Sequence, residues 1–123
     1  MHIKRFGQAA PYEAPNHYDM RALRLQGFEA GGPGQFWVGL SHLLPGGGAG
    51  PDSSALEKVY VVLAGAVNLK TAGEEAVLGP LDSVCIPPGE VREMRNHGNE
   101  VATLLVVMPY PPGGAPQGQE KRS

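Results

Sequence analysis

The chain has 123 residues, enough for one domain with its own hydrophobic core and too few for two. Apolar residues make up 41% of the chain, which is ordinary for a globular protein and argues against wholesale disorder. The formal net charge is −2, from 10 basic and 12 acidic residues, and no basic stripe is present. The sequence therefore gives nucleic-acid binding no electrostatic support.

Membrane and secretory signals are missing from this sequence. No apolar run approaches the roughly 18 residues of a membrane-spanning helix, and residues 1–7 lack the apolar core of a signal peptide. We therefore expect a cytoplasmic protein with no membrane partner. The single cysteine, Cys85, cannot form an internal disulfide, and its apolar neighbours predict a small buried hydrophobe.

The predicted elements divide the chain into three parts. Residues 1–30 form an N-terminal arm, in which weak alternation over 20–25 indicates a first strand. Residues 31–108 form the barrel, and residues 109–123, rich in Pro, Gly and Gln, form a flexible tail. Strand patterns of the barrel occur at 35–44, 57–63, 66–71, 75–78, 83–87, 91–96 and 102–108.

Gly and Pro, with 18 and 12 residues, cluster between these strands, notably at 45–51 and 87–89, and predict turns there. Many short strands without an amphipathic helix predict an all-β sandwich or barrel.

Two segments of the chain carry a family resemblance. In the second of them, residues 81–96, Pro87, Gly89 and Asn96 have the spacing of one cupin signature motif, and Gly65 closes the other motif. Together, residues 35–108 resemble the cupin superfamily. The resemblance implies a double-stranded β-helix, or jelly-roll barrel, with a small-molecule pocket inside, and a homodimer.

Four positions depart from the family pattern. Where cupins place three His and one Glu around a metal, this chain has Asp52, Ser54, Lys58 and Arg92. Arg does not give up its proton, Lys does so only when strongly perturbed, and two cations repel a divalent metal. The sequence therefore predicts no metal and no other cofactor at this locus.

The substituted residues instead predict an anion pocket. Strand alternation places Lys58 and Tyr60 on one face, and the resemblance implies that this face points inward. A guanidinium and an ammonium in an apolar cavity suit a carboxylate, a phosphate or an enolate. Asp52 is placed to pair with one of the cations. The predicted substrate-binding residues are Arg92, Ser54 and Met94.

The candidate proton carriers are Lys58, Asp52, Tyr60 and His42. His42 alternates with Phe36, Val38 and Leu40 in one predicted strand, and it is a candidate base near neutral pH if that face lines the barrel. The histidines at 2, 17 and 97 are interpreted as surface residues, although His17 could cover a pocket mouth.

We therefore expect a metal-independent isomerase, lyase or decarboxylase that acts on a small anionic metabolite. The arm packs on the partner in the expected homodimer. Two alternatives are a non-catalytic ligand-binding or accessory cupin, and a metal-dependent oxygenase or lyase with an irregular site that includes His42 and Asp52. In a purely structural alternative, an inward Lys-Asp or Arg-Glu pair fills a vestigial site, or the charges form an exposed salt-bridged rim.

Overall fold

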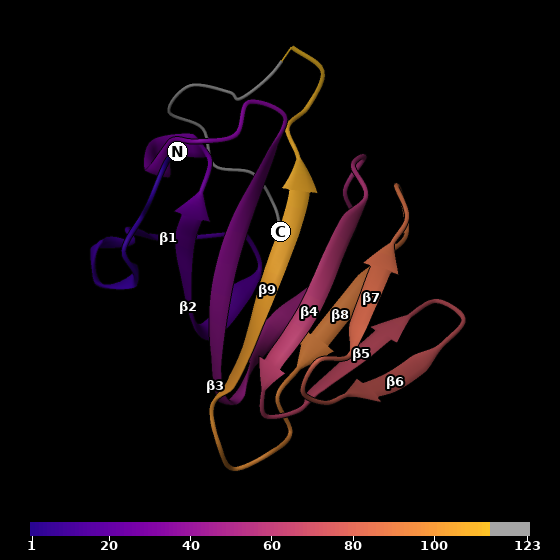
Figure 1. Cartoon of the computed structure of the whole chain (residues 1–123). Coiled ribbons are helices and arrows are strands. Elements are labelled where there is room, and N and C mark those ends of the chain that lie inside the picture. Colours follow the sequence, from indigo (N-terminus) through magenta and orange to yellow (C-terminus); the bar gives the residue numbers. More distant parts are fainter. Residues whose placement is uncertain (114–123) are drawn as a thin grey trace.

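The structure, a computed structural model, describes residues 1–113. It consists of short and long strands with two three-residue 3-10 helices (Figure 1). In chain order the elements are η1 (Phe6–Gln8), β1 (Pro11–Tyr12), β2 (His17–Gln26), η2 (Phe28–Ala30), β3 (Phe36–Asp52), β4 (Lys58–Ala64), β5 (Val67–Thr71), β6 (Glu75–Leu78), β7 (Ser83–Ile86), β8 (Arg92–Arg95) and β9 (Ala102–Pro109).

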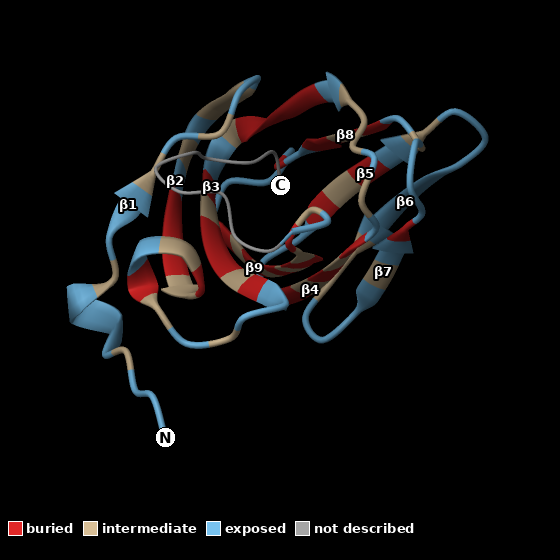
Figure 2. Cartoon of the chain, turned by 90° about the horizontal axis from the view of Figure 1, so that it is seen from above, coloured by how far each residue is buried: buried red, intermediate tan, exposed pale blue. Residues whose placement is uncertain are grey.

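The strands form one antiparallel sheet in the order β6-β5-β8-β3-β9-β4-β7, and the β1–β2 hairpin lies beside β3. This sheet curls into a nearly closed barrel. Seen from above, the buried stretches of β3, β4, β5, β8 and β9 surround the interior (Figure 2). The predicted all-β barrel is confirmed.

The middle of β3 differs from the prediction. The Gly-rich run at 45–51, predicted as a turn, lies within a continuous strand. Gly46 has a φ of +83°, which only glycine adopts easily, and the backbone bends there. A side chain at Gly48 would collide with the backbone oxygen of Met94 in β8. Glycine at these positions therefore lets the first half of β3 pair with β9 and the second half with β8.

The inward face of the barrel follows from the strand register. Trp37 lies opposite Met108, and Leu43 lies opposite Ala102, and all four side chains are buried. Because side chains alternate between faces, every second residue of β3, β4 and β9 faces this core. The outward residues of these strands are mostly half-buried, and Cys85 of β7 is exposed. Its predicted burial is wrong because it pairs with the outward Val59.

The turn residues behave as the sequence predicts. Gly89, in the turn between β7 and β8, has a φ of +82°. Asn96 is buried where β8 ends, and its Nδ2 donates hydrogen bonds to the carbonyl oxygens of Leu43 at 3.0 Å and Glu100 at 2.8 Å. Its Oδ1 accepts a hydrogen bond from the Gly98 backbone N–H at 2.9 Å. These bonds attach the β8–β9 loop to β3.

The N-terminal arm contributes more strand than alternation over 20–25 predicts. Strand β2 runs for ten residues and pairs with β3 along its length. At the other end of the chain, Pro109 is the last residue of β9, and most of the predicted tail, residues 114–123, lies outside the described residues. Within residues 1–113, no helix is both long and apolar enough to cross a membrane.

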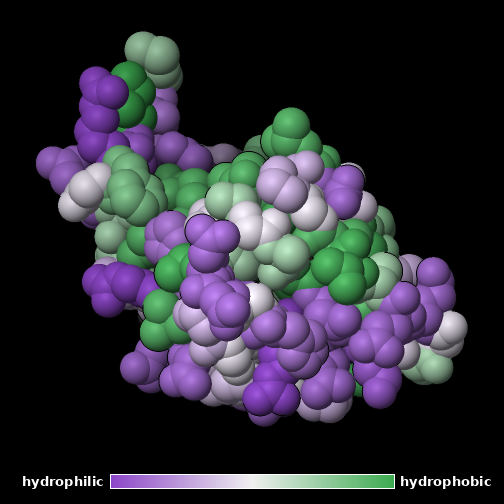
Figure 3. Space-filling view, turned by 90° about the horizontal axis from the view of Figure 1, so that it is seen from below, coloured by the Kyte–Doolittle hydropathy of each residue, from purple (hydrophilic) through white to green (hydrophobic). Residues whose placement is uncertain are grey.

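Exposed apolar side chains occur where the pairing of β3 with β9 ends and in the loop before β7. Leu44, within β3, follows the last residue paired with β9, Val101 precedes β9, and the backbone N–H of Leu81 donates a hydrogen bond to Val62 of β4. All three side chains are exposed. Seen from below, the surface mixes apolar side chains with polar ones (Figure 3).

Candidate functional site

The two basic residues at the substituted positions lie inside the barrel. Lys58 begins β4 and is 2% exposed, and Arg92 begins β8 and is 1% exposed. Each alternates with apolar residues that also face the core. The exposed salt-bridged rim is therefore wrong, because a rim residue would be in contact with solvent.

Arg92 is held by hydrogen bonds across the interior. Its Nε donates to the Tyr60 Oη at 2.9 Å, and its Nη1 donates to the backbone oxygen of Gly50 at 3.0 Å. Strands β8 and β4 are not neighbours in the sheet, so the bond from Arg92 to Tyr60 spans the barrel. It fixes the guanidinium two residues along β4 from Lys58.

Tyr60 keeps its proton in this environment. Burial raises the pKa of its phenol above 10.0, because the phenolate loses solvation inside the barrel. The charge of Arg92 and the hydrogen bond from it lower the pKa and oppose this effect in part. At neutral pH the Tyr60 oxygen therefore accepts a hydrogen bond from Arg92 while its own O–H remains a donor.

The first motif supplies Asp52 and Ser54 at the end of β3. Asp52 lies opposite Arg92 in the strand register, and its Oδ1 accepts a hydrogen bond from the Ser53 backbone N–H at 2.9 Å. The Ser54 Oγ accepts one from the Leu56 backbone N–H at 3.1 Å. The Ser54 carbonyl oxygen accepts one from the Gly89 N–H at 2.7 Å, so Ser54 joins the turns of the two motifs.

Met94 is buried in the core, where it lies opposite Ala49 and Leu69. It forms part of the apolar surroundings of the two cations. Substrate-binding roles for Ser54 and Met94 stay predictions.

His42 does not belong to this site. It pairs with Thr103, on the face opposite to the inward Leu43 and Ala102. Its Nδ1 lies 2.9 Å from the Thr103 Oγ1, and the ring of Phe6 contacts it edge-on from the arm. The predicted alternation is present in β3, but the face that carries His42 is the outer one. We therefore do not retain His42 as a proton carrier.

His17 belongs to this site, although the sequence predicts a surface residue. It begins β2 and lies opposite Ala49, which lies opposite Met94 in β8. These residues form one row on the inward face of the sheet. The arm carries no spacing motif that marks His17, and only the pairing of β2 with β3 places it there.

Charges of the site reach the His17 imidazole. Its pKa is lowered from 6.5, first by burial and then by the positive charges of Arg92 and Lys58. A hydrogen bond to the Pro15 carbonyl and the negative charge of Asp52 raise the pKa and oppose this shift. The His17 imidazole therefore lies within range of the charges of Lys58, Arg92 and Asp52.

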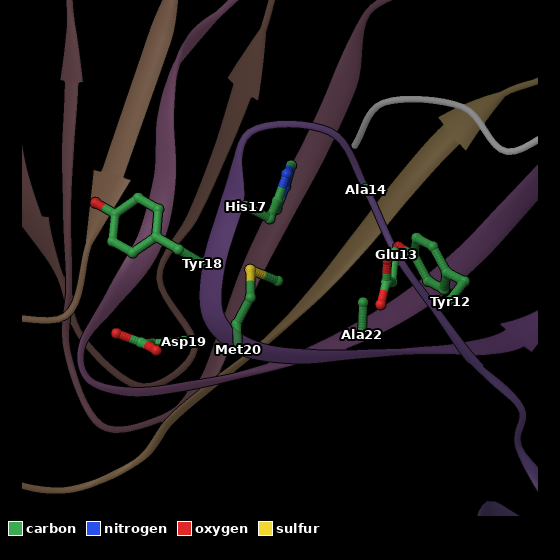
Figure 4. Close-up of a pocket in the computed structure, with 8 residues that line it drawn as sticks. All are labelled: Tyr12, Glu13, Ala14, His17, Tyr18, Asp19, Met20 and Ala22. Atoms are coloured by element: carbon green, nitrogen blue, oxygen red, sulfur yellow. The ribbon is translucent and has the colours of Figure 1, made fainter.

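A pocket of about 250 Å³ adjoins His17, between β2 and the loop that precedes it (Figure 4). The wall combines two tyrosine rings, one imidazole, two carboxylates and three apolar side chains. Its residues are Tyr12, Glu13, Ala14, His17, Tyr18, Asp19, Met20 and Ala22.

This set of side chains does not fit the metal that the family pattern implies. Among residues 1–113, no group of three or more His, Cys, Asp or Glu side chains could hold a metal ion. Lys58 and Arg92 occupy two of the expected ligand positions and offer N–H donors in place of lone pairs.

Comparison with known proteins identifies the family. The sequence model of the Cupin domain family matches residues 39–108, more than half of the chain. This chain is a cupin. A Mycobacterium tuberculosis protein named beta-D-galactosidase is 46% identical to it over 111 residues, which cover 90% of the cupin and 96% of that protein.

Solved structures agree with the cupin fold. The polyketide cyclase RemF from Streptomyces resistomycificus matches with a TM-score of 0.80 and 21% identity, covering 94% of this cupin and 82% of the cyclase. A cupin-superfamily sugar phosphate isomerase from Silicibacter pomeroyi matches with a TM-score of 0.70 and 27% identity, covering 85% of this cupin and 69% of that chain. The predicted family and fold are confirmed.

Proposed function

We propose that this cupin binds a small anionic carbohydrate, a sugar phosphate or a sugar acid, and isomerises it without a metal. The observation that carries the proposal is the burial of Lys58 and Arg92 together inside one barrel. Asp52 lies opposite Arg92 in the strand register and brings a carboxylate to the same region. A guanidinium and an ammonium in an apolar interior suit an anionic ligand.

The fixed geometry of Arg92 supports this function. Tyr60 and the Gly50 carbonyl occupy Nε and Nη1 and hold the plane of the guanidinium. Lys58 adds a buried amino group on the same face of β4 as Tyr60. An anion that accepts hydrogen bonds from both cations has its charge matched, and an enolate formed next to it is stabilised by the same cations.

The carbohydrate class is supported by the relatives. One is named for a sugar phosphate isomerase activity and the other for a galactosidase activity. Hydroxyl-rich ligands also match the wall of the adjacent pocket, where Glu13 and Asp19 offer hydrogen-bond acceptors.

A thermal-shift titration tests the binding site. We expect ribose 5-phosphate and gluconate to raise the melting temperature, and neutral galactose to do so less. Lys58→Met removes the buried charge, whereas Lys70→Met removes an exposed one and is the matched control. Loss of a charge-assisted hydrogen bond raises Kd by about tenfold or more. Equal binding by the wild type and Lys58→Met, or no response to either anion, contradicts the proposal.

Isomerase activity separates an enzyme from a non-catalytic binder. Conversion of ribose 5-phosphate to its ketose isomer is followed by NMR. Binding without conversion favours the ligand-binding cupin.

Elemental analysis of the purified protein addresses the metal-dependent alternative. That alternative gains support if a stoichiometric transition metal copurifies and its removal abolishes turnover.

Hydrolysis of a β-galactoside is the second candidate, favoured by the 46% identity to the protein of that name. Glycoside hydrolysis uses two carboxyl groups that flank the scissile bond. Asp52 in the barrel and Glu13 on the pocket wall are the carboxylates to test. Release of nitrophenol from a nitrophenyl β-galactoside, lost in both Asp52→Asn and Glu13→Gln, would favour hydrolysis over isomerisation.

A further inference from the structure

The arm brings one imidazole to the inward face of the barrel. The chain has four histidines, and all of them are among the described residues. His2 and His97 are exposed, and His42 lies on the outer face of β3. His17, opposite the fully buried Ala49, is the one that faces the core.

The protonation of this ring is set by its backbone contact. The His17 Nδ1 lies 2.7 Å from the carbonyl oxygen of Pro15. A carbonyl oxygen only accepts hydrogen bonds, so Nδ1 must carry the hydrogen and donate it. In the neutral ring, Nε2 is then the basic nitrogen. A base oriented by a hydrogen bond on its other nitrogen is the arrangement that general-base catalysis uses.

The surroundings of His17 keep its imidazole uncharged near neutral pH. Burial, Arg92 of β8 and Lys58 of β4 lower its pKa, while the bond to Pro15 and Asp52 of β3 raise it, and the net pKa lies below 6.5. Glu13 and Asp19 face the same pocket from the arm and from β2. At neutral pH the imidazole is therefore uncharged and basic.

The position of His17 links the pocket to the cations. His17 lines the pocket next to Met20, and both side chains project from β2 toward the space under the arm's loop (Figure 4). The strand register brings His17 near Arg92, because Ala49, opposite His17, lies three residues before Asp52, and Asp52 lies opposite Arg92. The pocket lining includes neither Lys58 nor Arg92, so the proposal requires a ligand whose anionic end extends from the pocket to the cations.

We propose that the Nε2 of His17 is the catalytic base of this cupin, an assignment that rests on the proposed function. Nε2 takes the proton from the carbon next to the ligand's carbonyl. The electron pair of that C–H bond becomes the C=C bond of an enediolate, and the carbonyl electron pair moves to oxygen. His17 returns its proton to the former carbonyl carbon, and the hydroxyl proton moves between the two oxygens, so no oxidant or co-reactant is needed.

The electrostatic part of the proposal can be tested without substrate. Imidazole nitrogen shifts are recorded by NMR across pH in the wild type and in Lys58→Met, and His97 provides an exposed reference in the same spectra. We expect a neutral ring with hydrogen on Nδ1, and a pKa that rises in Lys58→Met and on adding inorganic phosphate. A ring with hydrogen on Nε2, or a pKa indifferent to both changes, overturns the proposal.

The catalytic part is tested by hydrogen exchange in D₂O. Ribose 5-phosphate is incubated with wild type, His17→Gln and the surface control His97→Gln, and loss of the C2 proton signal is followed. Because a general base contributes about 10²- to 10⁴-fold, we expect exchange to fall by at least about a hundredfold in His17→Gln alone. The Kd for ribose 5-phosphate should change by less than about threefold in that variant.

The outcomes separate this proposal from the one on which it rests. If ribose 5-phosphate and inorganic phosphate both fail to bind the wild type, the anion site is wrong. If ribose 5-phosphate binds and is exchanged equally by wild type and His17→Gln, the anion site stands and the role of His17 is overturned. Binding without exchange in the wild type overturns the role of His17 and leaves a ligand-binding protein.

Discussion

Replacing Tyr60 with phenylalanine isolates the hydrogen bond that crosses the barrel. The substitution keeps the aromatic ring in the core but removes the oxygen that accepts the Arg92 Nε–H at 2.9 Å. Both side chains are almost completely buried, so water cannot readily replace the lost acceptor. The guanidinium then keeps its bond to the Gly50 carbonyl but leaves Nε without this partner.

The expected loss follows from the charge of the donor. A hydrogen bond to a charged group contributes about 1.5–3 kcal/mol. A domain of this length changes its melting temperature by about 4 °C for each kcal/mol, from an unfolding entropy near 2.1 cal/mol/K per residue. Tyr60→Phe should therefore lower the melting temperature by about 6–12 °C. Urea unfolding gives the same loss as a free energy.

Tyr18→Phe is the matched control for this measurement. Tyr18 is half-buried in β2 and lies opposite Gly48, and its ring centroid is 5.9 Å from the Arg95 guanidinium carbon. That contact survives loss of the hydroxyl, so the variant should unfold like the wild type. If Tyr60→Phe costs no more than Tyr18→Phe, the hydrogen bond does not hold Arg92, and the fixed guanidinium of the proposed anion site loses its support.

Three further predictions follow from individual residues and surfaces. Because the pKa of His17 is lowered in the folded state, the unfolded chain binds more protons than the folded protein once the pH falls below 6.5. The free energy of unfolding should therefore decrease on acidification below pH 6.5, and it should decrease less in His17→Gln. Asn96→Ala removes the three side-chain hydrogen bonds of Asn96 and should lower the free energy of unfolding, measured in urea, by about 3 kcal/mol. The control Asn99→Ala, at an exposed position, should change it by almost nothing. The outward Leu105 and Val107 make both faces of β9 apolar, and we expect a second copy of the chain to cover the outer face. Light scattering should therefore give the mass of a homodimer, and a monomer at micromolar concentration would contradict this.

Local chemistry made some features predictable from the sequence. Gly89 follows two prolines and adopts the positive φ expected of a glycine in such a turn. Asn96 ends a strand and bonds the backbone around it. Alternation placed Lys58 and Tyr60 on one face, and the resemblance assigned that face to the interior. In these cases the residue and its immediate neighbours carry the information.

Other features depend on partners that are distant in sequence. Alternation grouped His42 with Phe36, Val38 and Leu40, but it could not tell which face is inside, because pairing with β9 decides that. The same ambiguity led to the wrong burial of Cys85. His17 reaches the core only because β2 pairs with the second half of β3, and that pairing depends on a strand that continues through the Gly-rich run.

At the substituted positions, two buried basic side chains stand where the cupin pattern has metal ligands. A metal ion in such a site supplies positive charge that stabilises an oxyanion. Under the proposed function, Arg92 and Lys58 supply this charge, and Tyr60 orients the guanidinium of Arg92. Burial first, and then the positive charges of Arg92 and Lys58, lower the pKa of the nearby His17 imidazole. An arriving anion reverses part of that effect and raises the pKa of His17. Under the proposed function, ligand binding therefore strengthens the base at the moment when the base is needed.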